Sequence, residues 1–481
     1  MATSTVKLNG TTLMTVNDTT AVAADVVQGK VFTAVDGTKT TGTASSGAAP
    51  QKQVNFIDYD GTILYSYTAQ EANALSALPA NPSHSGLTAQ GWNWTLQEIK
   101  AQLTAMPDGP VWVGQMYITQ SGDTEIDVSM PDGRLSPILT IAVNGEVTVD
   151  WGDNTTASTV TGSSLTTRQA PSHTYAAPGD YTIKIHVVSG NFAFYGGSST
   201  YLLLRKDESS AATNRIYATC VQKIRVGSGI TNIGDYAFYL CTNATAITLP
   251  NTITSISQYA FDACYSLKSI IIPSGVAGLG NRAFDSCRSM RLVSIPSTVT
   301  SLTTYCFINS YALKSITIPA SVTSIGRDAF SGCYGLEEVV VPSNVTNINN
   351  NTFSTCYTLR SIKLPNSITS IGDSAFSSCS IVEQFSLPSS LTSIGSYAFS
   401  YCNCFVSVTI PSTVSSIGNS AFNACSGMKE YHVLSTIPPT LGTTVFNGIP
   451  SDCVIYVPAS SLTDYQAAEN WSAYASYMQG E

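Results

Sequence analysis

Cysteine and histidine are the side chains of this sequence best suited to nucleophilic or metal chemistry, but their spacing favours a structural role. Eight of the 12 cysteines each stand three residues after a phenylalanine. They are Cys241, Cys264, Cys287, Cys333, Cys356, Cys379, Cys402 and Cys425, and Ser310 takes the one missing place. The four histidines are scattered, and no C-x-x-C pair has a histidine nearby. We expect buried free thiols acting as small apolar fillers, with no metal or cofactor; disulfides and a metal site are the alternatives.

The same spacing defines a repeat of 23 residues. Phenylalanine recurs from Phe238 to Phe422 and proline from Pro250 to Pro411, always 23 apart. The run Leu-x-x-Ile-x-Ile-Pro predicts a short strand that ends at proline, which offers no N–H. The run Ile-Gly-x-x-Ala-Phe-x-x-Cys predicts one short helical turn. Because one coil cannot bury these side chains alone, we expect stacked coils over residues 221–458, with ladders of identical side chains inside.

The repeat resembles the BspA-like leucine-rich repeat family, in register over nine units. Cys453-Val-Ile-Tyr-Val457-Pro458 predicts a last, irregular strand. Residues 459–481, which include Tyr465, Trp471 and Tyr474, resemble the usual end of such proteins and predict a helical cap. The resemblance implies adhesion and surface recognition without a fixed ligand.

Tyrosine and arginine are frequent at two positions of the repeat that are expected to face outward. Stacked coils would align these side chains as two stripes. One stripe consists of the residues directly after each ladder cysteine position, which we call the stripe after the cysteine phase. The other consists of the residues two positions before each repeat phenylalanine. Together they contain Tyr265, Arg288, Tyr311, Tyr334, Tyr357, Tyr236, Tyr259, Arg282, Tyr305 and Tyr397. Phenols with polar tips suit a bacterial surface glycan or protein as the partner. The alternative is that the tyrosines only shield the edges of the coils.

The N-terminal residues 1–43 carry Gly29-Lys30, Asp36-Gly37-Thr38 and Thr41-Gly42-Thr43. This segment resembles a short module of tail fibres and tail-associated proteins of phages that infect gut bacteria. It predicts strands on either side of an Asp36-Gly37 turn, and attachment to other virion proteins. Residues 44–52 predict a flexible linker by composition.

Two interpretations compete for residues 53–118. Asp58-x-Asp60-Gly-Thr62 after an apolar strand resembles the first motif of haloacid-dehalogenase-type phosphatases, which implies a nucleophile and a general acid around Mg²⁺. That activity needs a parallel α/β domain, for which too few residues remain. We therefore favour a hairpin that turns at Asp60-Gly61, in a segment that resembles the small β-grasp-like repeats of bacterial surface proteins.

Residues 119–190 contain Trp151-Gly152-Asp153, His173-Thr174-Tyr175 and Pro178-Gly179-x-Tyr181. These motifs resemble a PKD-type immunoglobulin-like domain, and the alternation at Tyr181–Ile185 suits a half-buried strand. The resemblance implies that Asp153 and His173 serve turns and strand ends and do no chemistry. Residues 191–220 are expected to connect this sandwich to the solenoid.

Composition limits the partners. Charged residues make up 11% of the chain and the net charge is −9, so we expect no binding to nucleic acid. No stretch approaches the length of a membrane span. The start of the sequence lacks the apolar run of a signal peptide, so we expect that the protein does not use the common secretory route.

We therefore predict a mainly β, multidomain chain: small β modules and an immunoglobulin-like sandwich, followed by a leucine-rich-repeat solenoid. The leading functional hypothesis is a non-enzymatic phage tail fibre or tail-associated virion protein that recognises a bacterial surface and is assembled in the host cytoplasm. A bacterial cell-surface adhesin is the alternative, and a phosphatase using Asp58 and Asp60 is the third. Fibre proteins are often trimeric, although no heptad run here enforces a homo-oligomer.

Overall fold

The computed structural model describes four N-terminal strands together with residues 53–195, 202–206, 211–382 and 385–481. The four strands form two antiparallel hairpins. They are β1 (Ser4–Leu8), β2 (Thr11–Val16), β3 (Val31–Thr33) and β4 (Lys39–Thr41). Strands β3 and β4 flank the expected turn at Asp36-Gly37. The turn, the other residues of the tail-associated module and the linker up to residue 52 lie outside the described residues.

Residues 53–119 form a module with one mixed sheet, in the strand order β6-β5-β8-β7. The central strands β5 and β8 run parallel, and each outer strand pairs antiparallel with its neighbour. Phe56, Trp94 and Ile99 lie in its core. The elements are β5 (Val54–Ile57), β6 (Ile63–Tyr67), α1 (Ala69–Ala74), β7 (Leu87–Trp92), α2 (Leu96–Ala105) and β8 (Val111–Thr119). A parallel α/β sheet, which the phosphatase interpretation requires, is not what this region forms.

The next region joins the solenoid without a break. Its main sheet has the order β12-β11-β13-β9-β15-β17, and the last two strands belong to the first coils of the solenoid. The elements are β9 (Thr124–Met130), β10 (Ile138–Leu139), β11 (Ile141–Asp150), β12 (Ser158–Gln169), β13 (Gly179–Phe194), β14 (Leu204–Arg205) and α3 (Ala211–Ala218). The PKD-type assignment stays a prediction from sequence resemblance.

The segment expected as a connector, residues 191–220, contributes to this core. Phe194 packs edge-on against Phe238 with the ring centroids 4.8 Å apart, and β14 pairs with β10. Strand β9 pairs antiparallel with β15. This pairing covers the open end of the first coil, which would otherwise expose unpaired backbone groups. One hydrophobic core therefore runs from Ile126 to Met478.

Most coils of the solenoid contribute strands to two parallel ladders. The expected strand before proline is therefore followed by a second strand after it. In the first ladder, residues 23 apart pair directly, as Ile270 does with Val293. This ladder contains β15 (Val221–Arg225), β17 (Ala246–Thr248), β19 (Ser269–Ile271), β20 (Leu292–Ser294), β23 (Glu338–Val340), β25 (Ser361–Lys363), β28 (Ser407–Ile410), β30 (Glu430–Val433), β32 (Val454–Val457) and β33 (Met478–Gly480).

The second ladder uses the short segment that follows each proline, most often Ser-Ile or Asn-Ile, and its apolar side chains are buried. It contains β16 (Asn232–Ile233), β18 (Ser255–Ile256), β21 (Ser301–Leu302), β22 (Ser324–Ile325), β24 (Asn347–Ile348), β26 (Ser370–Ile371), β27 (Ser393–Ile394), β29 (Ser416–Ile417) and β31 (Thr440–Leu441).

The segment around each phenylalanine forms consecutive hydrogen-bonded turns, where a short helical turn was expected. Tyr236 and Leu240, two residues on either side of Phe238, have φ of 57° and 62°. The amide of Phe238 donates to the carbonyl of Ala260 in the next coil at 2.8 Å. Left-handed backbone costs a non-glycine residue about 1–2 kcal/mol. The hydrogen bonds between coils offset this cost at every repeat and prevent the i→i−4 bonds of a helix.

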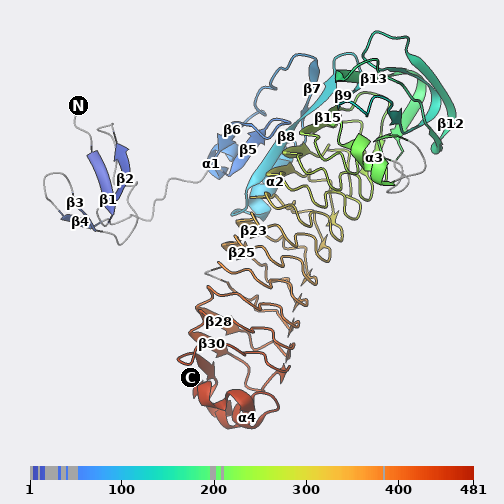
Figure 1. The fold of residues 1–481 in the computed structure, drawn as a ribbon. Coiled ribbons are helices and arrows are strands. Elements are labelled where there is room, and N and C mark those ends of the chain that lie inside the picture. Colours follow the sequence, from blue (N-terminus) through green and yellow to red (C-terminus); the bar gives the residue numbers. More distant parts are fainter. Residues whose placement is uncertain are drawn as a thin grey trace.

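The C-terminal residues close the far end of the rod, as Figure 1 shows. The cap contains η2 (Ala459–Ser461), α4 (Leu462–Ala467) and η3 (Ser472–Tyr477), and β33 returns to pair with β32. Tyr465 and Trp471 are buried, and their polar atoms donate to the carbonyls of Ser435 and Pro439 at 2.8 Å. The last coil is thus covered by aromatic side chains with satisfied hydrogen bonds.

The module of residues 53–119 lies along the first strand ladder (Figure 1), with β8 in contact with β17, β19 and β20. Gly114 allows the approach, because a Cβ atom there would lie 2.4 Å from the side chain of Ile271. At 2.9 Å each, the Asn93 amide donates to the carbonyl of Ile272 and the Trp94 indole to that of Ile295. The Gln102 amide donates to the carbonyl of Ile318 at 3.2 Å.

Among the described residues, no backbone N–H donates to these three carbonyls, because the residue that would donate to each is a proline in the next coil. Leu434 stands where the other coils have proline, and its N–H donates to the carbonyl of Ile410 at 3.0 Å. A proline at that phase has no N–H to give. The module therefore satisfies backbone groups that the repeat itself leaves unpaired.

Candidate binding surfaces

The tip of the β5–β6 hairpin rests on the solenoid. The Ser269 hydroxyl donates to the carbonyl of Tyr59 at 2.7 Å. Gly61 has a φ of 87° and sits directly over Ser269. The predicted turn at Asp60-Gly61 is confirmed, since the Gly61 amide donates to the carbonyl of Asp58 at 3.0 Å. The contact between hairpin and solenoid divides their junction into two cavities.

The geometry of the two carboxylates is that of a turn. Asp58 is 4% exposed; its Oδ1 accepts from the Tyr59 amide at 2.8 Å, and its Oδ2 lies 2.6 Å from His84 Nε2. Asp60 is exposed and accepts from the Thr62 amide at 2.8 Å. The Asp58 oxygens are thus engaged in local contacts. Burial, together with the carboxylates of Asp58 and Asp60, raises the pKa of Tyr59.

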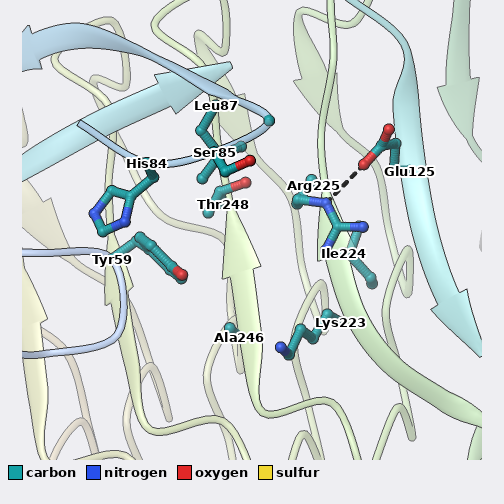
Figure 2. A pocket seen from close by; sticks show the side chains of 11 residues that line it. Tyr59, His84, Ser85, Leu87, Glu125, Lys223, Ile224, Arg225, Ala246 and Thr248 are labelled. Atoms are coloured by element: carbon teal, nitrogen blue, oxygen red, sulfur yellow. Dashed lines mark hydrogen bonds and ion pairs between the residues drawn. The ribbon is translucent and has the colours of Figure 1, made fainter. Parts of the chain in front are cut away.

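The first cavity, shown in Figure 2, encloses about 290 Å³. Tyr59 and His84 reach it from the module, and Lys223 and Arg225 from β15. Arg225 is neutralised by Glu125 at 2.8 Å and by Asp127 at 2.6 Å. Although burial opposes ionisation, the hydrogen bonds from Arg225 hold the pKa of Asp127 below its usual value. No salt bridge joins Lys223 to another residue that the structure describes.

The second cavity, of about 540 Å³, lies on the other side of the hairpin tip. Asp60, Gly61 and Thr62 form one wall, and the solenoid supplies the opposite wall. That wall consists of Thr245, Ser266, Lys268, Ser289, Arg291 and Leu292. This site was not predicted from the sequence, although Lys268, Arg291 and Lys314 stand 23 residues apart. The spacing that revealed the tyrosines could have revealed these cations.

The expected stripes are real ladders of contacting side chains. In the stripe before phenylalanine, the Tyr236 and Tyr259 rings stack at 4.5 Å. The Arg282 guanidinium lies 4.0 Å from the centre of the Tyr305 ring and 5.9 Å from that of Tyr259. These four residues therefore form one continuous run. Tyr397 has the same phase but is separated from that run by three coils, which carry Asp328, Asn351 and Ser374 at this position.

The stripe after the cysteine phase is continuous over five coils. The Arg288 guanidinium lies 4.2 Å from the centre of the Tyr265 ring and 5.5 Å from that of Tyr311. Tyr311 stacks on Tyr334 at 4.6 Å, and Tyr334 contacts Tyr357 at 5.1 Å. Within both stripes the ring faces are thus turned toward neighbouring coils. The edges and hydroxyls of these rings face outward, so most of the stripe offers no flat platform.

Tyr397 and Tyr401 differ from the other tyrosines. They lie two residues before and two residues after Phe399, and their side chains are 49% and 54% exposed. The neighbouring coils carry Ser374 and Ser378 on one side and Ser420 and Ala424 on the other. No ring of a described residue stacks on either tyrosine, and about half of each remains exposed. The sequence predicted Tyr397 as a binding residue but not Tyr401. Tyr401 stands two residues after the phenylalanine, at the second left-handed position of the turn segment.

The cysteine ladder is buried, as predicted, and its thiols are free. From the second coil on, each thiol donates to the carbonyl of the phenylalanine 26 residues earlier, as Cys379 does to Phe353 at 3.2 Å. Burial raises the pKa of Cys379 to about 12, which leaves the thiol protonated and unreactive at neutral pH. Ser310 makes the equivalent contact with Phe284 at 3.1 Å. Cys404, outside the ladder, is exposed.

Asp153 and His173 hold a strand end. His173 Nε2 lies 2.7 Å from Asp153 Oδ2, and the imidazole stacks on Trp151 with the ring centroids 5.2 Å apart. The Tyr175 hydroxyl donates to the carbonyl of Trp151 at 2.9 Å. These contacts fit the structural role expected for the pair.

The residues that the structure describes contain no group of three or more His, Cys, Asp or Glu side chains placed to hold a metal ion. Among the same residues, no helix is both long and apolar enough to cross a membrane.

The family model that matches this chain covers the solenoid. The family model described as BspA type leucine rich repeat region matches residues 210–337 and 323–451. A search of curated proteins finds no match. A leucine-rich repeat protein from Bacteroides ovatus is 22% identical, with a TM-score of 0.33, over 55% of this chain and 84% of that one.

Two further solved structures are similar to the chain. A leucine rich cell surface protein from Faecalibacterium prausnitzii is 25% identical, with a TM-score of 0.36, over 53% of this chain and 74% of that one. A leucine rich repeat protein from T. pallidum is 30% identical, with a TM-score of 0.32, over 38% of this chain and 78% of that one.

Proposed function

The chain belongs to the BspA-type leucine-rich repeat family, and from this premise we propose that it is a non-enzymatic recognition protein of the bacterial cell surface. The observation that carries the proposal is the outer face of the turn segments, where a rigid frame presents polar aromatic side chains coil after coil. Such side chains give contact area with little loss of conformational freedom. The ligand is a surface glycan or a surface protein.

We place the strongest contacts at Tyr397 and Tyr401. Both tyrosines are about half exposed, have no ring of a described residue stacked on them and lie beside coils with small side chains, so a sugar ring or an apolar side chain can pack against them. The inner tyrosines of the stripes have their faces covered by neighbours. They would contribute through phenol hydroxyls and ring edges, with Tyr357 at the end of its stripe as the most open of them.

The test is binding of the fluorescently labelled full chain to a panel of intact gut bacteria. The full chain is required because the core is continuous across β9 and β15, so a cut at the start of the solenoid would expose it. The double variant Tyr397→Ala/Tyr401→Ala is expected to weaken binding by about tenfold, since exposed aromatic anchors dominate interface energies. The double variant Tyr311→Ala/Tyr334→Ala is expected to weaken it less.

Val406→Ala is the matched control, because Val406 is an apolar side chain of the same coil region with 54% exposure and lies off the turn segments. Binding unchanged in both double variants would remove the tyrosines from the binding surface. A wild-type chain that binds no strain would contradict the proposed function itself.

A phage tail-associated protein is the second candidate, favoured by the resemblance of residues 1–43 to a short module of phage tail proteins and by the two hairpins, β1–β2 and β3–β4, in that segment. In that case the N-terminal module would attach the chain to other virion proteins, with a homotrimer as the expected assembly. The two candidates differ in location. Cosedimentation of the chain with phage particles would support the second candidate, and recovery with the envelope of the producing bacterium would support the first.

A further inference from the structure

The second cavity of the junction has the features of a site for an acidic saccharide. We propose that Lys268 and Arg291 bind a negatively charged group, a carboxylate or a phosphate, carried by a sugar that occupies this cavity. The volume, about 540 Å³, lies within the range of roughly 300–1,000 Å³ that small-molecule sites occupy. The biological meaning of the site rests on the proposed function, because it names a class of surface ligand.

The charges around this cavity are unusual for this chain. Charged residues make up only 11% of the sequence, yet Lys268, Arg291 and Lys314 follow one another at the same phase of successive coils. Adjacent parallel strands lie about 4.8 Å apart, so these cations repel one another. Lys314 lies 3.8 Å from Glu337. No salt bridge joins Lys268 or Arg291 to another described residue, and a bound anion would relieve their repulsion.

The remaining lining residues suit a sugar better than a bare ion. The hydroxyls of Thr245, Ser266 and Ser289 can donate to and accept from sugar hydroxyls. Asp60 stands on the opposite wall, where its carboxylate accepts hydrogen bonds from hydroxyls and repels a second negative charge. The site therefore favours a ligand with one anionic group at the Lys268 and Arg291 side and neutral hydroxyls at the hairpin side.

The position of the cavity also favours a binding role. The hairpin tip is fixed on one side by the contact between Ser269 and Tyr59, and the other wall belongs to the rigid strand ladder. Both walls are therefore in place before a ligand arrives, which lowers the entropy cost of binding.

Isothermal titration calorimetry of the full chain tests the proposal with three probes. Glucuronate carries one carboxylate, glucose 6-phosphate carries one phosphate group, and glucose is the neutral control. We expect one acidic probe to bind and glucose not to bind. The acidic probe that binds more tightly identifies the source of the charge. Lys268→Gln and Arg291→Gln are each expected to weaken binding about tenfold, as the loss of a charged hydrogen bond does.

Arg360→Gln is the matched control, since Arg360 is an exposed cation at the same phase but lies outside the cavity. It removes the same net charge and is expected to leave binding unchanged. The proposal is overturned if neither acidic probe binds at millimolar concentration, or if the two cavity variants bind as Arg360→Gln does. Binding of the wild-type chain to bacteria tests the proposed function separately, so each can fail without the other.

Discussion

The solenoid and the module docked on it both bury apolar side chains, but they are specified in different ways. In the solenoid one contact is repeated every 23 residues, as the stacked Phe307, Phe330 and Phe353 show. In the docked module each contact occurs once and joins distant parts of the chain; Trp94 and its partner Ile295 are 201 positions apart. A repeated contact can be found in a sequence by its period, whereas a single contact leaves no pattern.

The two regions are nevertheless linked by one property of the repeat. The prolines that end each strand leave a column of carbonyls without backbone donors, and Asn93, Trp94 and Gln102 donate to three of them. The module thus packs on a periodic surface through side chains that do not recur at a fixed spacing in the sequence.

The largest effect is expected from a break in the phenylalanine ladder. Phe330→Ala removes a fully buried ring stacked on both neighbours, and large-to-small changes of this kind cost about 3–5 kcal/mol. We expect the urea midpoint of the main unfolding transition, followed by circular dichroism, to fall accordingly. Phe56→Ala is the comparison, because Phe56 lies in the separate core of the module. A loss below about 1 kcal/mol for Phe330→Ala would mean that the coils do not share one core.

The docking contact should have an intermediate effect. Asn93 donates to the carbonyl of Ile272 at 2.9 Å and accepts from the Gly114 amide at 2.7 Å. Asn93→Ala leaves these buried groups unpaired, which costs about 1–3 kcal/mol. Hydrogen exchange should show faster exchange of the module amides while the distant coils stay protected. Gln90→Ala, which removes an exposed contact with Asn251, should change neither. Equal acceleration in both regions for Asn93→Ala would show that they unfold as one unit.

The contrast between the regions also explains what the sequence could predict. The period predicted the buried phenylalanine and cysteine ladders and the neighbouring tyrosines, and the Asp60-Gly61 turn followed from local turn chemistry. The left-handed residues, such as Tyr236, carry no glycine signal, because hydrogen bonds between coils impose the conformation on whatever residue stands there. The docking of Asn93 on Ile272 depends on complementary surfaces distant in sequence. The cations Lys268 and Arg291 did have the right spacing, but only the structure shows the cavity beside them.

The repeat also brings acidic side chains of neighbouring coils together, as with Asp262 and Asp285. Burial first, and then the neighbouring Asp285, raise the pKa of Asp262 to about 7, against the opposing charge of Arg282. The pKa of Asp262 is higher in the folded protein than in the unfolded chain. The free energy of unfolding is therefore highest below about pH 4 and falls as the pH rises to about 7. Asp262→Asn should therefore stabilise the protein by about 1–2 kcal/mol at pH 8 and little at pH 4, with partial solvent contact limiting the gain.

Urea unfolding at both pH values measures this difference. Asp373→Asn is the control, since Asp373 is an acidic residue of a later coil for which the same burial is absent. A stability difference between Asp262→Asn and the wild type that does not change with pH would contradict the raised pKa.

The smallest effect is expected at Ser310, the one position of the cysteine ladder that carries another residue. Ser310 is fully buried between the cysteine positions 287 and 333, and its hydroxyl donates to the carbonyl of Phe284 at 3.1 Å. Ser310→Cys keeps a donor at this place and adds apolar volume, so we expect a stability change within about 1 kcal/mol, in the stabilising direction. Denaturant midpoints measure it. A loss of about 1–3 kcal/mol would instead indicate overpacking, which would mean that the serine is required by the shape of that coil and that the period alone does not determine the core.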